Sequence, residues 1–174
     1  YRVRAPINAL TRAGKIESSL ANNWDDLIYP TPVEIERIKP DVLLTQNAFL
    51  EHMLVPWQRY KKFNDAFMVC GLDDLVYMLP HQHPKQGAWP KNIRRKVKQL
   101  FQASDRVIVA NDALAEEFSK MTDDIVVVPN YLENWRWDEL KKPTKQAGKK
   151  LRVGWAGGSE HISDLIFILP IVEA

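Results

Sequence analysis

Short apolar runs alternate with amphipathic helical patterns along most of the chain, and this alternation constrains the fold more than any other feature. The runs are nearly continuous in apolar residues, which is typical of parallel strands covered on both faces. Strands separated by helices predict βαβ units and one parallel sheet. The predicted strands are Val42–Thr45, Ala66–Cys70, Arg106–Ala110, Ile125–Val128 and Arg152–Ala156.

The helical segments between these runs have apolar residues spaced for one buried face. The clearest is Asn92–Ala103, in which Ile93, Val97, Leu100 and Phe101 form an i, i+4, i+7, i+8 stripe. Two further helices are predicted at Phe49–Lys62 and at Asn111–Met121, where Asn111 is a favourable N-cap. The fold class is therefore predicted to be α/β, a Rossmann-like parallel sheet with helices on both faces.

A polar, basic stretch at residues 141–150 contains Pro143 and Gly148 and indicates an exposed linker. Residues 1–140 are then expected to form a first Rossmann-like domain. Residues 151–174 would be the first βα unit of a second Rossmann-like domain, which is incomplete in this chain. Because a domain rarely stops one helix after its glycine loop, we expect the chain to be a fragment.

Composition excludes few function classes, but it indicates the cellular compartment in which the protein is expected. The net charge is +2, from 24 basic and 22 acidic residues, which gives no global signal for nucleic acid. Cys70 is the only cysteine, so no internal disulfide can form. The longest apolar run, Leu165–Val172, is too short for a membrane span. These features favour a reducing cytoplasm.

The stretch that begins at Leu151 indicates a strand, a tight glycine turn and a helix start. Gly157, Gly158 and Ser159 form the turn. Backbone N–H groups in such a turn, with the positive end of the helix dipole, suit an anionic group such as a diphosphate. His161 and Asp164 are three residues apart and share a helix face. The alternative is that the glycines only allow tight packing and that His161 is a surface residue.

Ligands in parallel sheets collect at the carboxyl ends of the strands. Asp73 and Asp74 follow the second predicted strand, where they can anchor sugar hydroxyls or act as a base; alternatively, they form a helix N-cap pair. Asn130 follows the fourth strand. The two aspartates are adjacent rather than in an Asp-x-Asp pattern. His81 and His83 have no further ligand at metal spacing, so no metal site is predicted.

A run of cations spans Lys85–Lys98, with Trp89 among them. The common interpretation of such a run is a solvated helix face. The functional interpretation is a patch for an anionic membrane surface or a phosphorylated acceptor. Nucleic acid is a third interpretation, supported by this local cluster alone.

Taken together, the motifs resemble those of a known enzyme family. The chain resembles the two-domain GT-B glycosyltransferases, and family 4 in particular. The resemblance covers nearly the whole chain in order, although the first strand of the family pattern is missing. Its segments are Tyr1–Pro6, Pro40–Leu44, Leu72–Leu75, Ala103–Val109, Leu114–Ala115, Val126–Asn130 and Arg152–Leu165.

The resemblance implies transfer of a sugar from a nucleotide-sugar donor, with retention at the anomeric carbon and no obligatory metal or separate cofactor. The acceptor, a glycan or a lipid-linked molecule, would lie mainly on the first domain, across a cleft from the donor on the second. Cell-surface polysaccharide or glycoconjugate synthesis is the expected setting, in the cytoplasm or peripherally at the inner face of the membrane. No nucleic acid partner is implied.

The resemblance also implies roles for individual residues. By position, Gly157, Gly158 and Ser159 would lie near the donor diphosphate, with Asp164 and Asn130 as further donor-binding residues. His161 would lie close to the cleft as a catalytic residue. Asp73 and Asp74 occupy the loop where many relatives keep a histidine that touches the donor sugar, so the sequence departs from the family there. The family's later acidic motif is not in this chain, which is therefore expected to be inactive by itself.

Two other functions stay open. One is a non-catalytic α/β module of a larger assembly, binding a partner through Trp135, Trp137 and the basic helix. The other is a nucleotide-binding enzyme such as an oxidoreductase, which the absence of a Gly-x-Gly-x-x-Gly motif makes weaker.

Overall fold

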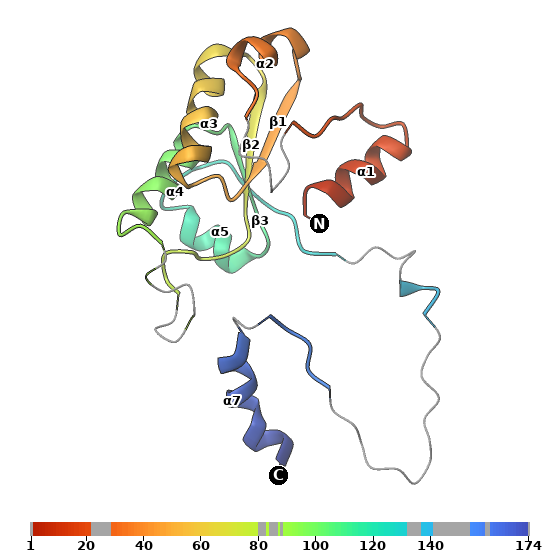
Figure 1. Cartoon of the computed structure of the whole chain (residues 1–174), viewed down its shortest axis with the longest axis vertical. Coiled ribbons are helices and arrows are strands. Elements are labelled where there is room, and N and C mark those ends of the chain that lie inside the picture. Colours follow the sequence, from red (N-terminus) through yellow and green to blue (C-terminus); the bar gives the residue numbers. More distant parts are fainter. Residues whose placement is uncertain are drawn as a thin grey trace. The chain divides into compact units, whose positions relative to one another are not determined.

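The computed structural model describes residues 2–21, 29–79, 83, 87, 89–131, 137–140, 154–158 and 161–173. The chain divides into two units; Figure 1 labels the helices and strands that belong to them. Unit 1 consists of Tyr1–Tyr77 and Asn92–Asn130, and unit 2 of Met78–Lys91 and Tyr131–Ala174. The predicted linker at residues 141–150 lies outside the described residues.

Unit 1 is built on a four-stranded parallel sheet with the order β1-β2-β3-β4. The strands are β1 (Val42–Gln46), β2 (Phe67–Leu72), β3 (Arg106–Val109) and β4 (Ile125–Val127). They confirm the first four predicted strands, with β2 running two residues past the predicted end at Cys70. The α/β fold class with a Rossmann-like parallel sheet is thereby confirmed.

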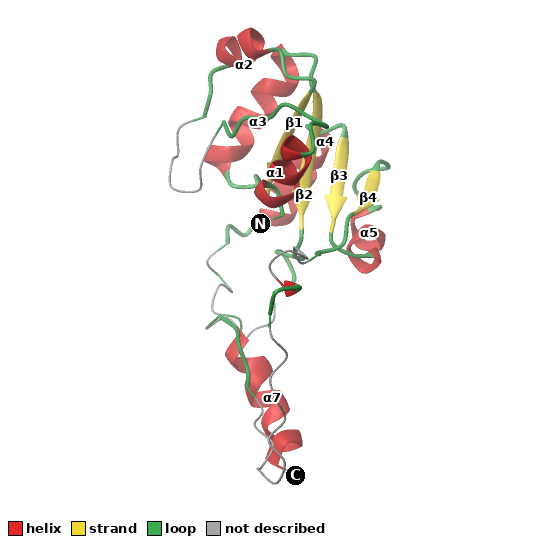
Figure 2. Ribbon diagram, turned by 90° about the vertical axis from the view of Figure 1, so that its right-hand side faces the viewer, coloured by secondary structure: helices red, strands yellow, loops and turns green. Residues whose placement is uncertain are grey.

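Three helices connect successive strands: α3 (Glu51–Phe63), α4 (Ile93–Gln102) and α5 (Asp112–Phe118). Because each strand pairs with the next one along the chain, right-handed crossovers put all three helices on the same face of the sheet. Figure 2 shows this helix layer behind the sheet. The core lies between the two layers, and its most buried side chains include Met68, Cys70, Leu72, Val97, Leu100, Phe101, Val107, Val109 and Phe118.

Helix α1 (Arg4–Arg12) lies on the other side of the sheet in both views, but none of its residues is buried (Figures 1 and 2). Helices therefore lie on both faces, as predicted, although only the layer of α3, α4 and α5 forms a core with the sheet. Helix α2 (Pro32–Ile38) contacts α3 and was not predicted. Its start is fixed by a capping box, in which Thr31 and Glu34 exchange hydrogen bonds between side chain and backbone.

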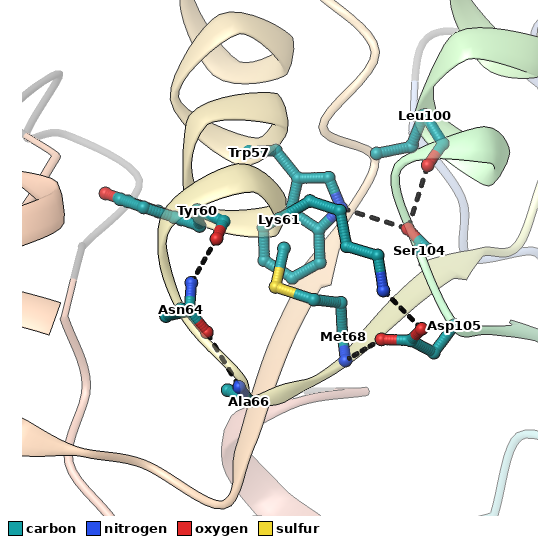
Figure 3. A network of polar contacts seen from close by, with 9 residues as sticks. All are labelled: Trp57, Tyr60, Lys61, Asn64, Ala66, Met68, Leu100, Ser104 and Asp105. Carbon is teal, nitrogen blue, oxygen red and sulfur yellow. Dashed lines mark hydrogen bonds and ion pairs between the residues drawn. The ribbon is translucent and has the colours of Figure 1, made fainter. Parts of the chain in front are cut away.

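A polar network joins the helix layer to the amino edge of the sheet (Figure 3). The Trp57 indole N–H donates to the Ser104 hydroxyl over 2.9 Å, and that hydroxyl donates to the carbonyl of Leu100 over 2.8 Å. Asp105 accepts a hydrogen bond from the N–H of Met68 over 2.8 Å, and its carboxylate is paired with Lys61. Ser104 and Asp105 lie in the short segment between α4 and β3, so the network ties this segment to α3 and to β2.

In unit 2, the described residues include helix α7 (Ile162–Glu173), which contains Pro170. The predicted fifth strand is not present in the described part of its range: Gly154–Ala156 belong to no strand, and residues 151–153 lie outside the description. A strand is held by ladder bonds to a neighbour, and the described residues offer this segment no partner. Helix α7 exposes several apolar side chains, among them Ile166, Phe167 and Ile171. None of the described helices has both the length and the apolar character needed to cross a membrane.

Candidate functional site

The carboxyl edge of the sheet in unit 1 carries the polar residues that the sequence places there. All four strands are parallel, so Gln46, Leu72, Val109 and Val127 end at one edge. Two clusters of polar side chains follow these ends. One joins the segments after β1 and β2, and the other lies after β4. This edge is the candidate functional site of unit 1.

The first cluster is formed by Asn47 and Asp73. The Asn47 side-chain N–H donates to an Asp73 carboxylate oxygen over 3.2 Å, and the Asn47 backbone N–H donates to the carbonyl of Gly71 over 3.0 Å. Asp73 is half-buried, whereas Asp74 beside it is exposed. The interpretation of the two aspartates as a helix N-cap pair is wrong, because residues 73–79, which follow directly, are not helical and the next described helix, α4, begins at Ile93.

Asn47 has two features that are typical of functional sites. Its φ is 55°, in the left-handed region that non-glycine residues rarely adopt. Its side-chain carbonyl oxygen is shielded from solvent and accepts no hydrogen bond from the described residues. The pair therefore presents a half-buried carboxylate, whereas the unused amide oxygen is shielded from solvent. The carboxylate suits a ligand rich in O–H donors, such as a sugar.

The second cluster brings together Arg2 and Asn130, which are 128 residues apart in the chain. The Arg2 guanidinium donates to the Asn130 side-chain oxygen, and it also donates to the carbonyl of Val128 over 3.4 Å. Both acceptors are neutral, so the positive charge of Arg2 meets no carboxylate in this contact. A cation held by neutral acceptors keeps its attraction for an anionic ligand.

The two clusters lie at opposite ends of the same edge. Asn47 follows β1 and Asn130 follows β4, three strand spacings away. At roughly 4.8 Å per spacing, strands β1 and β4 are about 14 Å apart. The two clusters therefore do not converge on one point.

Sequence reasoning identified Asp73, Asp74 and Asn130 but missed Arg2 and Asn47. A signal for Asn47 was present, because asparagine is among the few residues that tolerate the left-handed region and it stands directly after a predicted strand. No signal was available for Arg2, since its partner lies at the far end of the described sequence of unit 1.

The glycine turn lies in unit 2. A Cβ atom added at Gly157 would collide with the Trp155 ring, whereas one at Gly158 would meet nothing within 4 Å. A side chain at 157 would therefore require the exposed Trp155 ring to move, and no described neighbour restricts one at 158. Ser159 lies outside the described residues.

His161 and Asp164 come together at the start of α7, as the spacing predicts. The His161 Nδ1 and an Asp164 carboxylate oxygen are 2.9 Å apart, and the two side chains are 61% and 71% exposed. The carboxylate can orient the imidazole, and both groups are open to a ligand from solvent.

The basic run divides between two surfaces. Lys96 is paired with Glu51 of α3, whereas Lys91, Arg94, Arg95 and Lys98 are exposed. Lys85 lies outside the described residues.

Near this run, burial is the main cause that raises the pKa of the Tyr77 hydroxyl to about 12, and its hydrogen bond to Glu117 acts in the same direction.

In the ranges that the structure describes, no three His, Cys, Asp or Glu side chains gather as metal ligands would. Searches of protein-family models, curated proteins and solved structures found no match to this chain.

Proposed function

We propose that this chain is part of a GT-B glycosyltransferase that moves a sugar from a nucleotide-sugar donor to a glycan or lipid-linked acceptor. The observation that carries the proposal is the Asn47–Asp73 pair at the carboxyl edge of a parallel sheet. There a half-buried carboxylate is held by a hydrogen bond from the Asn47 side-chain amide. A fixed carboxylate acceptor of this kind matches the hydroxyl donors of a sugar.

In this proposal unit 1 holds the acceptor. Asp73 accepts a hydrogen bond from an acceptor hydroxyl and serves as its base, and Asp74 is the exposed neighbour that contacts the same sugar. Arg2, held by Asn130, attracts an anionic part of the acceptor or donor. Asn47 acts as a positioning residue, because its amide holds the Asp73 carboxylate in place.

Unit 2 contributes the donor side. Backbone N–H groups around Gly157, Gly158 and Ser159 hold the donor diphosphate, and the His161–Asp164 pair lies on the helix that follows. The open space at Gly158 supports this role, because the backbone there can be approached closely. The reaction proceeds with retention at the anomeric carbon, and the diphosphate charge is met by backbone dipoles and cations rather than by a metal ion.

The proposed setting is the synthesis of a cell-surface polysaccharide or glycoconjugate, in the cytoplasm at the inner face of the membrane. The exposed cations of the Lys85–Lys98 run support peripheral contact with anionic lipid. A non-catalytic binding module is the second candidate, favoured by the exposure of Tyr131 (76%) and Trp137 (52%).

Saturation-transfer NMR with a panel of nucleotide sugars tests the proposal on the full-length protein. We expect one nucleotide sugar to give transfer signals on its sugar and nucleotide protons, and the signals to disappear when an excess of the matching nucleoside diphosphate is added. If no nucleotide sugar in the panel binds, and the protein still binds a protein partner through Trp137, the glycosyltransferase proposal is rejected in favour of the binding module.

A further inference from the structure

A groove of about 380 Å³ runs between α4 and the segment after α5, on the helix layer of unit 1. Arg94, Arg95 and Lys98 line it from α4, and Lys120 and Met121 line it from the residues that follow α5. The groove thus combines four cations from two different elements. The sequence pattern predicted only the α4 part, as one stretch of the basic run.

The carboxylates near this groove leave most of its charge unpaired. Glu117 is paired with Lys120 and accepts a hydrogen bond from Tyr77 over 3.1 Å. The hydrogen bond from Lys120 is the main reason that the pKa of Glu117 lies below its ordinary value. Arg94 stacks over the Tyr77 ring at 5.6 Å from its centroid.

Two of the four cations have no partner of opposite charge in the described part of the chain. Neither Arg95 nor Lys98 forms an ion pair or a side-chain hydrogen bond there, and both are exposed. Glu117 acts on two of the four cations, Lys120 and Arg94, and not on Arg95 or Lys98. Cations that line one groove repel one another, so we expect the empty groove to lower the stability of the protein.

The position of these cations in α4 adds to the repulsion. Arg94 and Arg95 lie in the first turn of the helix, which contains no acidic residue. The first turn has a partial positive charge from its unpaired N–H groups, and it favours anions over cations. A sequence that puts two arginines there, beside two lysines, suits a site whose charge is balanced by a bound anion.

We propose that this groove, the α4–α5 cation groove, binds a phosphate-bearing ligand with two or more negative charges. Arginine offers paired N–H donors to phosphate oxygens, and lysine acts as a compact point charge. The two kinds of cation therefore suit a phosphomonoester or a diphosphate. The inference does not depend on glycosyl transfer, because the groove is lined by none of the residues of the proposed acceptor and donor sites.

Lys120 distinguishes this proposal from a diffuse basic helix face. A flat membrane contact made by α4 would use Arg94, Arg95 and Lys98 alone. A discrete site closed by two elements needs Lys120 as well. The groove therefore predicts that removal of Lys120 weakens binding about as much as removal of Lys98.

The test is a titration of the 174-residue chain with pyrophosphate, followed by two-dimensional amide NMR at low ionic strength. We expect the largest shifts at residues 94–98 and 119–121, with affinity falling as salt is added. The variants Arg95→Gln, Lys98→Gln and Lys120→Gln should each weaken binding about tenfold, the equivalent of one charge-assisted hydrogen bond. Arg59→Gln on α3 is the matched control, because Arg59 is exposed and lies outside the groove.

A second measurement on the same variants keeps the test independent of ligand choice. Without ligand, Arg95→Gln and Lys98→Gln should raise the melting temperature at low salt, since repulsion is relieved, and the gain should vanish at high salt. Equal weakening by the Arg59→Gln control, or unchanged affinity in Lys120→Gln, would overturn the proposal. Because pyrophosphate can also reach the glycine turn, Gly158→Val serves as a further control: it should leave the shifts at residues 94–98 intact whether or not the proposed donor site exists.

Competition with vesicles identifies the source of the phosphate group. If vesicles that contain phosphatidic acid displace pyrophosphate from the groove, and neutral vesicles do not, the ligand is a lipid headgroup. If neither displaces it, the ligand is a free phosphorylated molecule. Both results presuppose the groove site and support it.

Discussion

Replacing Asp105 tests how the helix layer is attached to the amino edge of the sheet. Its carboxylate accepts from the Met68 N–H over 2.8 Å, and Met68 is fully buried. The Asp105 backbone N–H returns a bond of 2.7 Å to the Met68 carbonyl. Asp105→Ala removes the side-chain acceptor and leaves the Met68 N–H without a protein partner.

The expected loss follows from these contacts. An unsatisfied buried N–H costs about 1–3 kcal/mol. The Asp105 side chain is 28% exposed, so water can reach the site in the variant, which puts the cost in the lower half of that range. The ion pair with Lys61, itself 39% exposed, adds less than about 1 kcal/mol. We expect Asp105→Ala to destabilise unit 1 by about 2 kcal/mol, or roughly 8 °C in melting temperature.

Asp105→Asn separates the two contributions. The asparagine oxygen still accepts from Met68, but the ion pair with Lys61 is lost, so the expected cost is below about 1 kcal/mol. Asp124→Asn is the matched control, because it breaks the exposed ion pair with Arg106 at the same edge. Urea unfolding of all three variants measures the differences. Equal losses in Asp105→Asn and Asp105→Ala would refute the argument that the buried N–H dominates.

The acid dependence of the same variants is an independent check. The hydrogen bond from Lys61 is the largest cause that lowers the pKa of Asp105, and the bond from Met68 contributes. A carboxyl whose folded-state pKa is depressed stabilises the protein fully above its unfolded-state pKa, and this stabilisation is lost as pH falls through the folded-state value. The stability difference between the wild type and Asp105→Ala should therefore shrink in acid. A constant difference would contradict the assignment.

Three further predictions follow from the sites described above. Gly158→Val should melt like the wild type, because a Cβ there meets nothing within 4 Å. In the full-length protein it should nevertheless weaken nucleotide-sugar binding about tenfold; unchanged donor affinity in a titration would make the turn a packing feature only. Asn47→Gly should relieve the strain of the left-handed backbone conformation at this position. It should nevertheless lower the rate of sugar transfer to the acceptor, because Asp73 loses its hydrogen-bond partner. An unaltered kcat in steady-state kinetics would show that Asn47 is not part of the site. Cys70 should react negligibly with iodoacetamide at pH 8 in the native state, because burial raises its thiol pKa to about 12; rapid alkylation without unfolding, seen by mass spectrometry, would disprove that packing.

The strands and the main helices of unit 1 were predictable because one strong pattern governs each. Ile93, Val97, Leu100 and Phe101 form one stripe, and all four are buried. The side chain of Asn111 accepts from the N–H of Leu114, as its position before an apolar helix predicts. Helix α2 was missed although Thr31 and Glu34 have the spacing of a capping box, because its seven residues are too few for periodicity to stand out.

The contacts that define the sites were less predictable, because they join residues that no local pattern connects. Arg2 and Asn130 meet across 128 residues, and Lys120 reaches the groove from a different element than Arg95. At Arg152–Ala156 the error was to predict an element, a strand, that the described residues of this range do not form. Its residues have strand propensity, but a strand needs a neighbour, and propensity carries no information about partners.

The strand order has a consequence for where a crevice can form. In open parallel sheets the crevice lies at the switch point, where neighbouring strands send their connections to opposite faces. Between β1 and β4 every connection crosses the same face, so the described sheet contains no switch point. Among the described strands β1 pairs only with β2, which leaves its outer edge open to another strand. A strand bound there, with its connection over the face where α1 lies, would create the switch point directly beside Asn47.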